Sequence, residues 1–269
     1  MPFLPIILIS LRLAVRARFA WMAVGSLLAM SLAALLAAQF SGRQPTTAAL
    51  DIGLSVLRLL LPLVLVLLTQ ELLSRELDRR YYLNTLAYPH PRHSLLLGRF
   101  AAIVLLIIGL LLLAATALAV LLWLISKNYE QGTPIALGQN YVVTITFIGV
   151  DLLLLTATAS LLAIVSSTSS FVLIGTLGFM LVARSFGTVV ELLTRNTGVV
   201  NDAETYRSNL GLLGYLLPDL GALDVRMITL YGQLDFLPAD WPGLVTATLV
   251  YTIGLLGLAV WMLQRKRFA

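Results

Sequence analysis

Three ionisable side chains interrupt long apolar runs of the sequence: Arg58, Asp151 and Arg184. In a membrane each would cost about 2.5 to 3.5 kcal/mol near a helix centre, so these side chains should face protein or water rather than lipid. Counting along the runs at about 1.5 Å per residue places all three in the outer half of the bilayer, where they could form one ion-paired cluster. Two roles are open for this cluster: it lines an export path or gate, or it is a structural salt bridge between helices, with the arginines reaching toward the surface.

The sequence contains none of the motifs of common catalytic sites. It has no Cys, which excludes thiolate catalysis and cysteine-ligated metal centres. Its two lysines, Lys127 and Lys266, are followed by Asn128 and Arg267, so there is no phosphate-binding loop of the G-x-x-x-x-G-K-[ST] type and the chain does not hydrolyse ATP by itself. Serine-hydrolase and zinc-protease motifs are also absent. We therefore expect a protein that is not an enzyme.

Two further groups of polar residues have simple structural explanations. His90 and His93 are the only histidines, and a metal site would need more ligands than they supply, so a solvated turn is favoured and neither a metal nor a cofactor is expected in this chain. The hydroxyl-rich run from Ser166 to Ser170 is explained by a tight turn between two helices.

The composition decides the fold class. At 59% hydrophobic and 12% charged residues, with a mean hydropathy of +0.94, the chain has too much apolar surface for a water-soluble fold. Apolar runs of about 20 residues predict transmembrane helices, because a lone segment in lipid satisfies its backbone only as a helix. We expect an all-α polytopic protein, one transmembrane domain over residues 1–269, with six spans. The runs are Phe19 to Gln39, Ile52 to Gln70, Arg99 to Ile125, Tyr141 to Val165, Phe171 to Val190 and Pro242 to Leu263.

Positive charge is concentrated in alternate segments between the spans. The two ends, 1–18 and 264–269, together with the loop 71–99, contain eleven basic and three acidic residues, whereas the other connections contain five basic and nine acidic residues. By the positive-inside rule, both termini and the loop are cytoplasmic. We expect a multi-pass protein of the inner (cytoplasmic) membrane. Its basic residues reflect this topology, so we expect it to contact the lipid bilayer and not to bind nucleic acid.

Three segments outside the spans have patterns of their own. Residues 1–18 carry Arg12 and Arg16 on one helical face, which predicts an amphipathic helix at the inner interface. Residues 191–241 form the longest connection, which is extracytoplasmic in this topology. Within it, the apolar stretch 210–217 is too short to span, and either a short interfacial or re-entrant helix or an ordinary packed loop helix accounts for it.

The segment 71–98 is a candidate coupling loop. Opposite charges four residues apart extend the second span as a charged helix, and two prolines then break it, which leaves a short helix around residues 83–88 at the cytoplasmic surface. The charge pairs are Glu71 with Arg75 and Glu76 with Arg80, and the prolines are Pro89 and Pro91.

This loop resembles the one between the second and third helices of ATP-binding cassette (ABC) transporter permeases of the type-2 export class. That family has an acidic and basic run, then Leu-Leu-x-x-Pro-x-x-Arg, then Leu-Leu-Gly-Lys or Leu-Leu-Gly-Arg. The resemblance extends to the basic helix before the first span, to the outer segment 217–224 and to the basic ending of the chain. The loop residues that match in order are Glu76, Leu83, Leu86, Pro89, Arg92, Leu96, Leu97, Gly98 and Arg99.

The resemblance implies a function. Such permeases pair into dimers and dock two separate ATPase subunits, so ATP and Mg would be bound by the partner and not by this chain. Closure of the ATPases would tilt the helices attached to the loop and open a path for export. The resemblance does not identify the substrate or say whether the dimer is a homodimer or a heterodimer. It also leaves the subfamily open among efflux, cytochrome c maturation and copper-enzyme maturation permeases. The residues implied in ATPase coupling are Glu76, Leu83, Thr85, Leu86, Pro89 and Arg92.

Two other functions are compatible with the same residues. An ion-coupled secondary transporter would use Arg58, Asp151 and Arg184 directly and would work on an ion gradient alone. A membrane assembly protein without transport would tolerate neutral residues at these three positions.

Overall fold

The computed structural model describes residues 3–15, 19–74, 92–127, 137–166, 168–195 and 218–265. These residues form helices joined by short turns, and no strand occurs among them. Six of the helices are long and apolar enough to cross a membrane, which confirms the all-α fold with six spans. The spanning helices are α2 (Ala20–Phe40), α3 (Pro45–Thr69), α6 (Arg92–Ser126), α7 (Gln139–Val165), α8 (Ser169–Arg195) and α11 (Trp241–Arg265).

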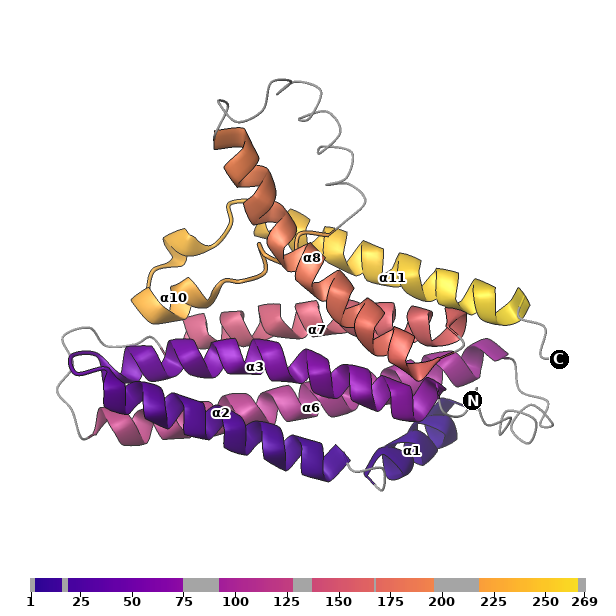
Figure 1. Ribbon diagram of the computed structural model, residues 1–269, viewed down its shortest axis with the longest axis horizontal. Coiled ribbons are helices and arrows are strands. Elements are labelled where there is room, and N and C mark those ends of the chain that lie inside the picture. Colours follow the sequence, from indigo (N-terminus) through magenta and orange to yellow (C-terminus); the bar gives the residue numbers. More distant parts are fainter. Residues whose placement is uncertain are drawn as a thin grey trace.

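The centre of the bundle is made by α3 and α7, which are buried along most of their length, whereas α2 and α11 are largely exposed (Figure 1). On α3, leucines three or four residues apart are fully buried, among them Leu50, Leu54, Leu57 and Leu61. This spacing places them on one helical face, the stripe that packs against the neighbouring helices. The outward faces of α2 and α11 are also apolar, as expected for helices in contact with lipid.

Two short helices lie at opposite ends of the bundle, α1 (Phe3–Ala14) at one and α10 (Arg226–Tyr231) at the other (Figure 1). We call these the α1 end and the α10 end. The helix α1 packs on α6 where Gly98 leaves room for it, because a Cβ at this position would lie 2.7 Å from the Ile6 side chain. The exposed side chains of α1 include leucines, an isoleucine and Arg12. A helix thus occurs within the segment 1–18, and its place at the membrane interface stays a prediction.

Several helices begin earlier or end later than the apolar runs suggest. The third span starts at Arg92 rather than at Arg99, so the helix includes polar residues such as His93 and Ser94 that precede the apolar run. At the α1 end, Ser166 bonds to Thr168 through its hydroxyl, accepting the Thr168 N–H at 3.0 Å and donating to the Thr168 carbonyl at 2.6 Å. The serine-rich run therefore contains the tight turn predicted between α7 and α8.

The structure describes the connection 191–241 in part. The last turn of α8 ends at Arg195, the chain is described again from Pro218, and α10 and a single 3-10 turn, Leu234–Phe236, precede α11. The apolar stretch 210–217 lies outside the described residues. The described outer segment, residues 218–231, buries Leu220, Leu223 and Ile228 in the core. It is thus part of the folded bundle rather than a separate unit.

Candidate functional site

The three charges of the apolar runs meet near the α10 end of the bundle. Arg184 Nη2 of α8 donates a hydrogen bond to Oδ2 of Asp151 on α7, at 2.5 Å. Arg58 Nη2 of α3 lies 3.8 Å from the same Asp151 oxygen. One carboxylate therefore sits between two guanidinium groups from different helices. The sequence indicated only that the three residues lie at a similar depth in the membrane, and the structure shows their side chains in contact.

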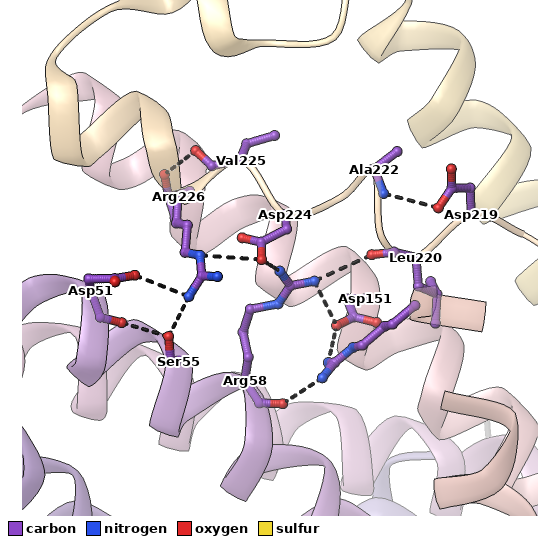
Figure 2. A network of polar contacts seen from close by, with 12 residues as sticks. Asp51, Ser55, Arg58, Asp151, Asp219, Leu220, Ala222, Asp224, Val225 and Arg226 are labelled. Carbon is purple, nitrogen blue, oxygen red and sulfur yellow. Dashed lines mark hydrogen bonds and ion pairs between the residues drawn. The ribbon is translucent and has the colours of Figure 1, made fainter. Parts of the chain in front are cut away.

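The cluster extends beyond these three residues into the outer segment (Figure 2). Arg58 Nη1 lies 2.5 Å from Asp224 Oδ2, and the same oxygen lies 3.4 Å from Arg226 Nε. Arg226 Nη1 in turn lies 3.1 Å from Asp51 Oδ1 at the start of α3. The six residues form a chain in which negative and positive charges alternate and balance, and we call it the charge chain: Asp51, Arg226, Asp224, Arg58, Asp151 and Arg184.

The charge chain runs from the protein interior to its surface. The Asp151 side chain is 1% exposed, whereas those of Asp224 and Asp51 are 30% and 45% exposed. Ion pairs at the exposed end are weak, because water and salt screen them. At the buried end, removal of one partner would leave an uncompensated charge, which is strongly unfavourable.

Backbone carbonyls supply further contacts to the buried arginines. Arg58 Nη2 donates to the Leu220 carbonyl at 3.3 Å, and Arg184 Nη1 donates to the Arg58 carbonyl at 3.0 Å. Even so, Asp151 Oδ1 and the Nε atoms of Arg58 and Arg184 are buried without a hydrogen-bond partner in the described structure. The contacts within the charge chain therefore do not satisfy every buried polar atom of its inner end.

The outer segment is fastened directly over Arg184. The Leu220 N–H donates to the Ala183 carbonyl of α8 at 3.2 Å, and Asp219 closes a turn by accepting the Ala222 N–H at 3.1 Å. A Cβ on Gly221 would lie 2.6 Å from the Arg184 carbonyl, so only glycine allows the loop to approach α8 this closely. The loop therefore covers the buried end of the charge chain.

A second set of contacts joins the outer segment to α7. The hydroxyls of Thr144 on α7 and Thr229 on α10 are 2.7 Å apart, and Thr229 also donates to the Asn140 carbonyl at 3.2 Å. With the contacts to α8 and to α3, the outer segment is thus bound to three spanning helices.

A polar cavity of about 630 Å³ lies beside the charge chain. Arginine guanidinium and aspartate carboxylate groups line it, together with a hydroxyl and small residues, and they include no cysteine or histidine. This set can bind or release charged groups and exchange ion-pair partners. The lining residues are Ser55, Arg58, Arg184, Gly187, Asp219, Gly221, Ala222, Asp224 and Arg226.

Sequence reasoning missed half of the charge chain. Asp51, Asp224 and Arg226 were counted only as charges of the outer connections, because their partners cannot be identified by depth. One signal was available: Asp224 ends the outer segment 217–224, which the family resemblance had already marked. The predicted coupling residues Glu76, Leu83, Thr85, Leu86 and Pro89 lie outside the described residues, and Arg92 is the first residue of α6.

Among the described residues, six helices of spanning length enclose a buried cluster of ion pairs at one end, as in a polytopic membrane protein. Comparison with known families gives the class. The family model described as "ABC-2 family transporter protein" matches residues 14–193, about two-thirds of the chain. The protein belongs to this family, and it is a membrane permease subunit of an ABC transporter. A comparison with curated proteins found no match.

Membership in the family confirms the resemblance found at the loop. It also fixes the general role of the chain, a transport subunit that is not itself catalytic and that associates with an ABC ATPase and the membrane.

Proposed function

We propose that this chain converts closure of a separate ATPase pair into the opening of an export path, with the charge chain holding the outer end of that path closed. The match to the ABC-2 transporter family over residues 14–193 is the observation that supports this most strongly. The absence of a phosphate-binding loop from the sequence adds to it, because a partner must then supply the nucleotide site. ATP and Mg belong to that partner.

The α1 end is assigned to the cytoplasm, and both termini lie there. Support comes from the excess of basic residues in segments 1–18, 71–99 and 264–269. The ATPase would dock on the coupling loop through Glu76, Leu83, Thr85, Leu86, Pro89 and Arg92. A second permease subunit, identical or not, would complete the path in the inner (cytoplasmic) membrane.

The helix α3 connects the loop to the charge chain. It precedes the loop at the α1 end and carries Asp51 and Arg58 near the α10 end. Twelve residues separate Arg58 from Gln70, which is roughly 18 Å at the helical rise. Pro62 lies between the two and leaves the Arg58 carbonyl without its helical hydrogen bond, so Arg184 Nη1 of α8 bonds to this carbonyl instead. A tilt of α3 at its cytoplasmic end therefore reaches Arg58 through a helix that is held to α8 at this point.

Arg58 is the node of the proposed gate. It contacts Asp151 on α7 and both Asp224 and the Leu220 carbonyl of the outer segment, so displacement of one side chain loosens three contacts. The polar cavity beside it offers water and the cavity-lining charges as alternative partners. The gate can then open without leaving bare charges in an apolar medium.

The coupling role is tested by asking whether an ABC ATPase from the same cells co-purifies with this chain. We expect the ATPase to co-purify with the unaltered protein and to be lost when Leu86 and Arg92 are both replaced by Ala. Leu36→Ala with Arg43→Ala is the matched control, since these exposed residues lie at the opposite end of the bundle. Melting temperatures of both variants report folding. Unchanged association of the Leu86 and Arg92 variant would contradict the coupling role.

The buried charges also favour a second candidate, an ion-coupled secondary transporter, because Asp151 lies in the membrane interior between two arginines. Purified chain in vesicles separates the two functions. Transport on an ion gradient without any ATPase would support the second candidate, whereas strict dependence on ATPase and Mg-ATP would support the first.

A further inference from the structure

The cytoplasmic end of α3 has an unusual shape. Directly after Thr69 the helix widens into a single π turn, η2 (Gln70–Ser74). Such turns are rare and frequently occur at functional sites. Here the Leu72 carbonyl accepts a hydrogen bond from Arg99 Nη1 at 3.0 Å. The π turn is thus bonded to the neighbouring helix α6.

Arg99 places a charged guanidinium in a buried position. It is 8% exposed, and burial of a guanidinium within a membrane bundle is unfavourable unless its contacts compensate. Leu72 and Leu73 of the π turn are buried beside it, at 0% and 2% exposure.

The bond joins the two arms of the coupling loop. Leu72 lies three residues before the segment 75–91, and Arg99 lies eight residues after it, so their hydrogen bond connects positions 27 residues apart across the loop. The helices α3 and α6, which the ATPase would move, are therefore fastened to each other at their cytoplasmic ends.

The same turn contacts the rest of the bundle. Gln70 Nε2 donates to the Ser169 carbonyl at the start of α8 at 2.5 Å, and η2 also packs against α1 and α7. Four other helices thus meet α3 at η2. The loop 75–91 therefore joins the bundle through this turn at one end and through α6 at the other.

We propose that Arg99 is a positioning residue that clamps α6 to the π turn, so that the two helices flanking the coupling loop move as one body when the ATPase closes. This inference rests on the proposed function. Without the clamp, the wide π turn absorbs the displacement of the loop, and the tilt of α3 does not reach Arg58 and the charge chain. The clamp acts through the Leu72 carbonyl and touches neither substrate nor nucleotide.

The natural absence of cysteine makes the test direct. Cysteines at Leu59 and Tyr231, both exposed, would carry spin labels on α3 and at the end of α10, and pulsed spin resonance would give their separation. The sample is the complex with a cysteine-free ATPase unable to hydrolyse ATP. In the otherwise unaltered chain, Mg-ATP should shift the distance distribution, because α3 moves relative to the outer segment.

Arg99→Met removes the donor and the charge but keeps an unbranched apolar side chain in the buried position. We expect this variant to bind the ATPase as the unaltered chain does and to lose most of the ATP-dependent shift. Arg99→Lys, which keeps a charge and a donor, should restore much of it. Arg12→Met, an exposed arginine of α1, is the matched control and should keep the full shift. If Arg99→Met does not fold, Arg99→Gln, too short to reach the carbonyl, is measured with the same expectation.

The outcomes separate this inference from the proposed function. A full ATP-dependent shift in Arg99→Met, or in Arg99→Gln, would overturn the clamp and leave the proposed function intact. Failure of Arg99→Lys to restore the shift would also count against a clamp that needs only a cationic donor. No ATPase binding, or no shift, in the unaltered chain would overturn the proposed function and the inference with it.

Discussion

The two ends of the bundle use buried arginines in different ways. At the α10 end, Arg58 and Arg184 pair with carboxylates beside a polar cavity. At the α1 end, one of the contacts of Arg99 is a hydrogen bond to the Leu72 carbonyl of the π turn, where Leu72 and Leu73 are buried. Ion pairs next to water can exchange partners, whereas a carbonyl held in a helix stays where the backbone holds it. Under the proposed function, the α10 end is the part of the bundle that separates and the α1 end is the part that stays joined.

Loss of the central carboxylate should have the largest effect. Asp151→Asn leaves Arg58 and Arg184 without their shared buried anion, and removal of one partner of a buried pair costs about 3 to 5 kcal/mol. We expect a clear fall in melting temperature in detergent and reduced transport. Asp235→Asn is the matched control, because Asp235 is exposed and outside the charge chain. Unchanged melting and full activity of Asp151→Asn would remove the charge chain from the account.

Loss of the node should have the next largest effect. Arg58→Met leaves Asp151 paired with Arg184, and Asp224 with Arg226, so we expect a cost of about 2 to 3 kcal/mol, as for charged hydrogen bonds. Hydrogen exchange of residues 218–231 should become faster, since these residues lose their tie to α3. The equivalent change in the Arg99 clamp, Arg99→Met, should leave that exchange unaltered. Equal protection in both variants would contradict the contrast between the two ends.

The close approach of the outer segment to α8 provides a smaller test. Gly221→Ala places a Cβ 2.6 Å from the Arg184 carbonyl, and the shift needed to relieve it should cost about 1 to 3 kcal/mol. Gly254→Ala is the control, because a Cβ there meets nothing within 4 Å. Melting temperatures of the two variants should therefore differ. A Gly221→Ala protein as stable as Gly254→Ala would mean that the loop does not need this fit.

The exposed end of the charge chain should matter least for stability. Asp51→Asn breaks an ion pair whose carboxylate is 45% exposed, and surface pairs contribute about 0 to 1 kcal/mol. The effect should shrink further at high salt, because mobile ions screen exposed charges. Melting at low and high ionic strength measures this. A loss of stability as large as that from Asp151→Asn would contradict the expected difference between the exposed and buried ends of the charge chain.

The sequence contained most of the fold and half of the site. Six runs of spanning length determined the helices, and the depth of Arg58, Asp151 and Arg184 was enough to predict their meeting. The partners Asp224 and Arg226 could not be found in this way. They lie in a connection outside the predicted spans, where counting residues along a helix does not give a position in the membrane. The π turn and the Leu72 contact of Arg99 were also invisible, since a widened turn keeps the apolar pattern of an ordinary helix.

The most direct test is whether Mg-ATP binding by the ATPase separates the residues of the charge chain at the α10 end. Asp51 and Arg226, whose side chains are in contact at the exposed end of the charge chain, would be replaced by cysteines and joined with a short bifunctional thiol reagent in the complex with the ATPase. We predict rapid cross-linking without nucleotide and severalfold slower cross-linking with Mg-ATP. Equal rates with and without Mg-ATP would contradict the claim that ATP closure opens this end.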